Sequence, residues 1–80
     1  MNHDLKIERP YFQAIRDGRK TFEIRYNDRG FNAGDTVTLK EYDGFCFSGE
    51  QETRRIGYVT GFSQHPNWVV FSLLPLEVKP

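Results

Sequence analysis

The sequence has a single cysteine, no long apolar run and no net charge. One cysteine, Cys46, cannot form an internal disulfide, which fits a reducing compartment. No stretch approaches the ~18 consecutive apolar residues of a membrane span, and the opening MNHDLKIERP lacks the apolar region of a signal peptide. Eleven basic residues balance eleven acidic ones, so binding to nucleic acid would need a local patch. We expect a cytoplasmic protein with no membrane partner.

The sequence also lacks the usual motifs of metal, cofactor and nucleophile sites. His3 and His65 have no cysteine or carboxylate at metal-ligand spacing. Cys46 lies between two phenylalanines and is expected to be buried or incidental rather than nucleophilic. There is no glycine-rich phosphate-binding motif and no signature of a serine triad. We therefore predict neither a metal nor a cofactor.

What the sequence does contain is a short chain rich in aromatic residues. Its 80 residues predict one domain, residues 1–80, which buries only roughly 60% of the surface of the unfolded chain. Seven Phe, four Tyr and one Trp each bury a large area, which suits a small, tight core.

Alternating polar and apolar residues predict five strands, and Pro10 followed by Gly18 predicts a short helix between the first two. Gly57 and Gly61 in the fourth strand indicate a bulge or a barrel bend. The fold class is therefore α+β, a small β-barrel of about five strands that closes its own edges, with an open α+β sandwich as the alternative. The strands are expected at residues 3–7, 20–26, 36–42, 53–62 and 68–76, and the helix at 9–18.

The same alternation predicts which side chains face the core. The last strand is apolar on both faces, so we expect it to be central and covered on each side. Residues 43–52 are expected to form a hairpin connection. The predicted core-facing residues are Leu5, Ile7, Tyr11, Phe12, Ala14, Ile15, Phe22, Ile24, Tyr26, Val37 and Leu39.

The strand at 20–26 and the turn after it carry most of the candidate site. One interpretation is a solvated strand face whose charges pair for little net energy. The other is a ligand seat on the outward side, where an arginine fork and a lysine meet an anion or a base edge and a carboxylate accepts from an amino group. One of Arg54 and Arg55 could join this seat. The candidate ligand-binding residues are Lys20, Thr21, Glu23, Arg25, Asp28, Arg29 and Arg55.

Some aromatic residues could also serve a ligand or a partner. Most must be core, but one or two could stack on a base. Phe45 and Phe47 are the pair most expected to be exposed, and Trp68 could rim a cleft. If Phe45 and Phe47 are exposed together, they favour a protein-interaction module, for example a phage factor acting on a host protein.

The string GRKTFEIR, after PYFQAI and before FNAGD, resembles the ASCH domains of the PUA-like superfamily of small β-barrels. The resemblance covers Pro10 to Thr38 and looks closest to an uncharacterised ASCH-like family of bacteria and their phages. It implies a barrel with a cleft beside the helix and the second strand. ASCH domains are generally predicted to bind RNA or nucleotides there, so RNA or a nucleotide is the implied partner.

One ASCH branch is an amidohydrolase acting on acetylated cytidine. Lys20 matches its catalytic lysine, but Glu23 stands where that branch has a threonine, and its later glutamate lies in a helical insertion that this chain lacks. A lysine nucleophile also needs a lowered pKa, whereas a neighbouring carboxylate favours the charged form. The resemblance therefore favours a binding module over an enzyme. An amidohydrolase using Lys20 and Glu23 is the alternative, and the oligomeric state stays open.

Overall fold

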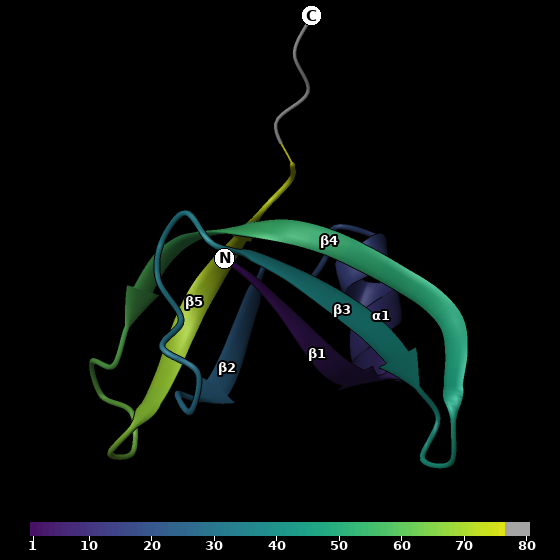
Figure 1. Ribbon diagram of the computed structural model, residues 1–80, viewed down its shortest axis with the longest axis horizontal. Coiled ribbons are helices and arrows are strands. Elements are labelled where there is room, and N and C mark those ends of the chain that lie inside the picture. The colour runs from purple at the N-terminus through teal and green to yellow at the C-terminus, as the bar shows by residue number, and fades with distance from the viewer. Residues whose placement is uncertain (77–80) are drawn as a thin grey trace, which may run out of the picture.

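The computed structural model describes residues 1–76 and shows one sheet of five strands with one helix (Figure 1). The spatial order of the strands is β1-β3-β4-β5-β2. Among residues 1–76, no helix has the length and apolar character needed to cross a membrane. The elements are β1 (Asn2–Glu8), α1 (Arg9–Arg16), β2 (Phe22–Tyr26), β3 (Thr36–Tyr42), β4 (Phe47–Thr60) and β5 (Trp68–Leu74).

The helix α1 begins at the predicted residue, Arg9, and ends at Arg16, two residues before Gly18. Pro10 lies in its first turn, where a missing N–H leaves no hydrogen bond unmade. The N–H of Asp17 donates to the Gln13 carbonyl at 2.8 Å, and Gly18 follows with φ +80°, a conformation that favours glycine. A helix this short is stable only when it packs on other elements, and α1 packs on β1 and β3.

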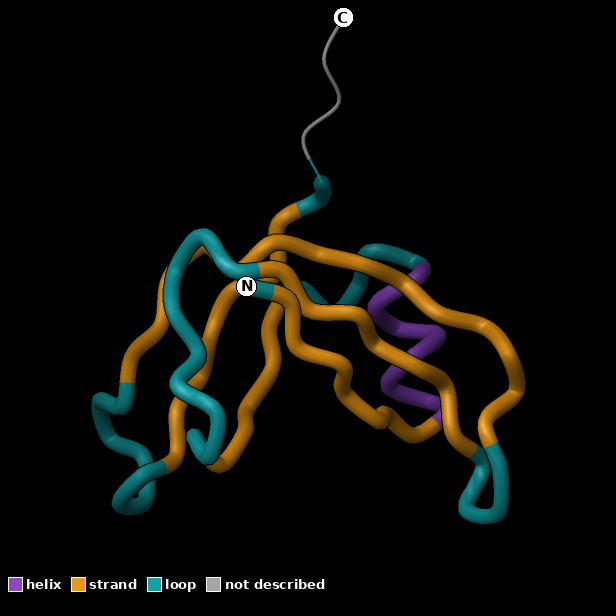
Figure 2. The backbone as a smooth tube through the Cα atoms, viewed as in Figure 1, coloured by secondary structure: helices purple, strands orange, loops and turns teal. Residues whose placement is uncertain are grey.

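The sheet curls into a half-barrel rather than a closed barrel. β1 pairs with β3 in parallel, while the β3–β4, β4–β5 and β2–β5 pairs are antiparallel. β4 arches across the top of the half-barrel, and the loop 27–35 crosses in front of the sheet (Figure 2). The predicted α+β class, with five strands and one helix after the first, is confirmed. The expectation that the sheet closes its own edges is wrong, because β1 and β2 are both edge strands.

The core fills the concave side of the half-barrel beneath α1. Leu5, Ile7, Val37 and Leu39 are buried as the alternation predicts. Gly57 lies at the predicted bulge, where the register shifts between Ile56 and Val59, and an added Cβ would come within 2.7 Å of the Ser72 hydroxyl. The buried apolar residues are Leu5, Ile7, Phe12, Ile15, Phe31, Val37, Leu39, Ile56, Phe71 and Leu73.

Three predictions about the periphery need correction. β4 begins at Phe47, so only a short turn precedes it and the predicted connection 43–52 is mostly strand. β5 is covered on one face only, because within residues 1–76 no second layer lies outside the sheet; Phe71 is buried but Trp68 is exposed. Tyr11 on α1 and Cys46 in the short turn before β4 are also exposed rather than buried.

The two faces of β2 are reversed relative to the prediction. Phe22, Ile24 and Tyr26 are 44–49% exposed, whereas Glu23 is 4% exposed. The physical reason is that β2 ends the sheet and its inner face meets the edge of β1, not another apolar layer. The inner face of β2 can therefore carry charge, provided that the charged groups find partners.

Candidate functional site

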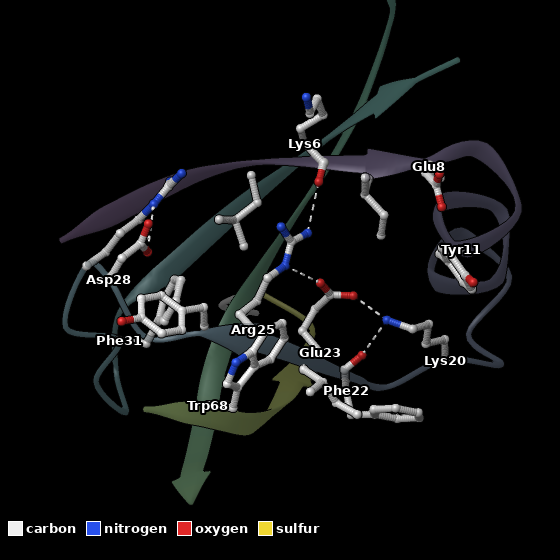
Figure 3. A pocket seen from close by; sticks show the side chains of 15 residues that line it. Lys6, Glu8, Tyr11, Lys20, Phe22, Glu23, Arg25, Asp28, Phe31 and Trp68 are labelled. Carbon is white, nitrogen blue, oxygen red and sulfur yellow. Dashed lines mark hydrogen bonds and ion pairs between the residues drawn. The ribbon is translucent and has the colours of Figure 1, made fainter. Parts of the chain in front are cut away.

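A cleft of about 750 Å³ lies between the free edges of β1 and β2 (Figure 3). We call it the seam cleft. Its size falls within the range of small-molecule sites, roughly 300–1,000 Å³. β1 and β2 line it along their facing edges, and α1, the loop 27–35 and β5 each contribute to its rim. Apolar walls come from Leu5, Ile7, Ile24 and Phe31, and aromatic rims from Tyr11, Phe22, Tyr26 and Trp68.

Glu23 is the buried centre of a charged triad in the seam cleft. Its Oε2 accepts from Arg25 Nε at 2.8 Å, and its Oε1 contacts the Lys20 ammonium. Lys20 and Arg25 are themselves partly exposed to the cleft. Figure 3 shows Glu23 between the two cations, each aimed from a different side. The triad carries a net positive charge of one, which suits a ligand with a single anionic group.

Three of the four cations that line the cleft also bond to backbone carbonyls at the open edges. Arg25 Nη2 donates to the Lys6 carbonyl at 2.9 Å and Arg29 Nη1 donates to the Asp4 carbonyl, both on β1. Lys20 Nζ donates to the Phe22 carbonyl at 2.8 Å on β2. These carbonyls face outward from the sheet, where a sixth strand would otherwise supply N–H groups. Side-chain donors thus replace the missing strand.

Arg29 reaches β1 from the loop 27–35, which is held in place at both ends. Asn27 Oδ1 accepts from the Phe31 N–H at 2.9 Å and fixes the first turn. At the other end, Asp35 Oδ2 lies 2.9 Å from His3 Nε2 on β1. Asp28 lies exposed at the cleft rim, 3.6 Å from Arg29 Nε. The loop therefore positions Arg29 without burying it.

Hydrogen bonding from His3 lowers the pKa of Asp35 from its usual value of 3.8. Partial burial acts in the opposite direction, while the Asn32 N–H and the N-terminal ammonium add to the lowering. The Asp35 carboxylate is therefore ionised in the folded protein at all ordinary pH values. Its charge helps to fasten the loop that carries Arg29.

Aromatic rings surround the cationic groups of the cleft. Lys20 Nζ lies 5.1 Å from the centre of the Phe22 ring and 5.9 Å from that of Tyr11, within the range of cation–π attraction. Tyr26 and Trp68 meet edge to face at 6.1 Å. Planar apolar faces and cationic donors thus lie side by side, an arrangement that can hold a flat ring with an attached anion.

Five of the seven predicted ligand-binding residues line the seam cleft: Lys20, Glu23, Arg25, Asp28 and Arg29. The other two lie elsewhere. Thr21 is exposed, and its carbonyl accepts from the Leu73 N–H at 2.8 Å. Arg55 donates to the Gly34 carbonyl at 2.7 Å and lies on β4, which β3 separates from β1 and β5 separates from β2. Trp68 rims the cleft, as predicted.

Sequence reasoning missed two parts of the site. The core prediction included Tyr11, Phe22 and Tyr26, but these three side chains line the cleft. The hydrophobicity of a residue alone does not distinguish a core position from a cleft position. The carbonyls of Asp4 and Lys6 carry no sequence signal at all. Among residues 1–76, no group of three or more His, Cys, Asp or Glu side chains is arranged to hold a metal ion.

Fold and site together define a class: a small α+β domain built on a curled five-stranded sheet whose open seam is lined by cations and aromatic rings. The chain belongs to the family described as Domain of unknown function (DUF3850), which matches residues 2–73. It is also similar to the "Uncharacterized 12.9 kDa protein in GpA 3'region" of Escherichia phage P2. The two are 33% identical over 86 residues, which cover 96% of this chain and 76% of the phage protein.

Proposed function

We propose that this chain is an RNA- or nucleotide-binding module that holds its ligand in the seam cleft. The observation that carries the proposal is that Lys20, Arg25 and Arg29, from three different segments, converge with four aromatic side chains on one cleft of about 750 Å³. Guanidinium and ammonium groups recognise phosphate and base edges, and aromatic faces stack on bases. The resemblance of residues 10–38 to ASCH domains of the PUA-like superfamily supports the same proposal.

Each side chain of the triad has a distinct role in this proposal. Arg25 Nη1 has no hydrogen-bond acceptor within residues 1–76, so it can donate to a ligand while Nε and Nη2 stay bonded. Glu23 keeps the guanidinium in this orientation, which makes it a positioning residue. Lys20 binds the phosphate by moving away from the Phe22 carbonyl. It then loses its hydrogen bond to that carbonyl and forms a charge-assisted hydrogen bond to the phosphate.

Binding should weaken only slowly as salt is raised. The slope of log K against log salt is about −0.7 per phosphate contacted in a single strand. Because the cleft holds one net positive triad and Arg29, we expect one or two phosphate contacts. A steep slope, typical of a long basic surface, would contradict this site.

Titration of the four nucleoside monophosphates and a labelled single-stranded RNA, followed by calorimetry and fluorescence anisotropy, tests the proposal. Lys20→Ala and Arg25→Ala should each weaken binding by at least about tenfold, since each removes a charge-assisted hydrogen bond worth roughly 1.5–3 kcal/mol. Arg55→Ala is the matched control, because Arg55 is a cation outside the cleft. Thermal melts show whether the variants are folded. If Lys20→Ala or Arg25→Ala does not fold, Arg29→Ala replaces it in the test, because this substitution leaves both ion pairs of Glu23 intact. Unchanged binding in all three cleft variants would reject the site.

An amidohydrolase acting on a modified nucleoside is less well supported. Lys20 donates to both Glu23 and the Phe22 carbonyl, so its nitrogen is held as a hydrogen-bond donor rather than offered as a nucleophile. We expect no acetate release from acetylated cytidine above the uncatalysed rate. Turnover that disappears in Lys20→Ala would reverse this preference.

A further inference from the structure

A second hollow of about 470 Å³ lies beside the seam cleft, and nothing in the preceding proposal uses it. We call it the hairpin groove, because its far wall is the β3–β4 hairpin. The two hollows share Leu5, Lys6 and Arg29, so they meet along the edge of β1. A ligand that leaves the seam cleft past Arg29 enters the hairpin groove directly.

The hairpin groove repeats the chemistry of the seam cleft. Phe47 offers an aromatic face that is 54% exposed, and Gln51 beside it offers an amide. Lys6, Arg29 and Lys40 supply three cations, with Lys6 Nζ also 4.5 Å from the centre of the Tyr42 ring. An exposed aromatic ring next to cations is the arrangement that holds a stacked base and its phosphate.

The two acidic residues of the groove do not cancel these cations. Glu50 is paired with Arg16 at 2.8 Å, so its charge is already balanced from outside the groove. Asp4 lies 3.4 Å from Lys40, but the Asp4 side chain is 60% exposed and that of Lys40 is 40% exposed, and ion pairs that solvent reaches are weak and easily exchanged for a phosphate. The groove therefore keeps a cationic balance when a ligand approaches.

We propose that the hairpin groove is a second nucleotide subsite, so that the ligand is single-stranded nucleic acid of at least two nucleotides whose backbone crosses β1 at Arg29. This inference rests on the proposed function of the seam cleft and names its ligand class. A duplex does not fit, because its bases are paired and stacked inside, whereas each hollow receives one unstacked base. A mononucleotide fills only the seam cleft and leaves Phe47 and Lys40 without a role.

The test compares two ligands on the same protein: an equal mixture of the four ribonucleoside monophosphates and a labelled random-sequence hexaribonucleotide pool. The pool should bind the wild-type chain at least tenfold more tightly. Lys40→Ala combined with Phe47→Ala should remove about tenfold from binding of the pool and leave monophosphate binding unchanged, because stacking and phosphate contacts are lost only in the groove. Lys40→Ala alone should also reduce the salt slope by about 0.7.

Matched controls come from Arg55→Ala and Phe62→Ala, a cation and an exposed aromatic residue that line neither hollow. If Phe47→Ala unfolds the hairpin in a thermal melt, Phe47→Leu keeps an apolar contact with Tyr42 and removes only the flat ring. Equal affinity of the pool and the monophosphates, or equal loss of both in the double variant, would overturn the second subsite alone. Absence of binding by both ligands would overturn the function of the seam cleft and this inference with it.

Discussion

Two buried glutamates on the inner face of the same sheet have partners of different kinds. Glu23 on β2 and Glu41 on β3 are each 4% exposed. Glu23 bonds to two cations, Lys20 and Arg25. Glu41 instead accepts from the Gln13 side chain at 3.3 Å and lies 3.7 Å from Arg9 Nε, whose side chain is 59% exposed. The two carboxylates are equally buried, but the cost of burial is offset by two close ionic contacts at Glu23. At Glu41 it is offset by a neutral amide and one longer ion pair.

The difference shows that a buried carboxylate does not by itself mark a site. Both partners of Glu41 come from α1, so Glu41 fastens the helix to β3. The partners of Glu23 keep surface in the seam cleft and bond across to the edge carbonyls. What separates a candidate ligand seat from a structural anchor is therefore the remaining exposure of the cations and their position on a cleft.

Glu23→Gln should have the largest effect. It leaves Lys20 and Arg25 facing a neutral amide, which should lower the free energy of unfolding by roughly 2–3 kcal/mol, less than for a fully buried pair because both cations reach solvent. Urea unfolding measures the change. RNA binding should also weaken, since Arg25 is no longer held. A variant as stable as the wild type would show that the triad does not differ from a surface ion pair.

Double-mutant cycles measure each ionic contact directly. The cycle of Lys20→Ala with Glu23→Gln should give a coupling energy of about 1–2 kcal/mol, and the cycle of Arg9→Ala with Glu41→Gln less than about 0.5 kcal/mol, because Arg9 is well solvated. Equal coupling energies from urea unfolding would remove the distinction between the two glutamates.

Glu41→Gln should have a smaller effect than Glu23→Gln. The amide keeps the shape of the side chain and can still accept from Gln13, so we expect a loss of about 1 kcal/mol in the free energy of unfolding. Binding of RNA should not change, because Glu41 lines neither hollow. Impaired binding by the folded Glu41→Gln variant would mean that α1, not the triad, controls the cleft.

Asp35 extends the comparison to a partly exposed carboxylate, and its effect should be the smallest. Because its folded pKa is lowered below 3.8, it stabilises the fold above that pH and loses this contribution as pH falls through the folded pKa. His3→Ala should return the pKa of Asp35 toward 3.8, so the stabilising contribution of Asp35 becomes smaller. Acid unfolding followed by tryptophan fluorescence should shift upward by a few tenths of a pH unit. Asp35→Asn, which has no charge to lose, should show no such dependence on His3.

The strands and the helix could be predicted because local patterns determine them. β3 matches its predicted residues in full, and Pro10 and Gly18 mark the helix. The closure of the sheet could not be predicted, since it depends on whether β1 and β2 meet, and strand periodicity says nothing about that. The early start of β4 was missed because residues 48–51 after Phe47 are polar or glycine and exposed, so no apolar alternation marks them as a strand.

The site was predicted in its residues but not in its orientation. Five of the seven residues line the cleft because lysine and arginine cluster locally in the sequence. Their inward direction was missed, since the rule that apolar residues face inward fails at an edge strand whose inner face borders a cleft. Arg55 was wrongly assigned to the site because the sequence does not show which strands are neighbours in the sheet. Its strand, β4, is adjacent to neither β1 nor β2. The hairpin groove depends on the pairing of β3 with β4, which no local pattern specifies.

Capping of the edge carbonyls also governs how copies of the chain behave toward one another. A bare sheet edge is a template for strand pairing between molecules, and proteins guard such edges with charge. Lys20, Arg25 and Arg29 occupy the carbonyls of Phe22, Lys6 and Asp4, so another copy cannot use them. Loss of all three cations would therefore expose two aggregation-prone edges at once. The residues proposed to bind a ligand would then also be the ones that protect both sheet edges from pairing with another chain.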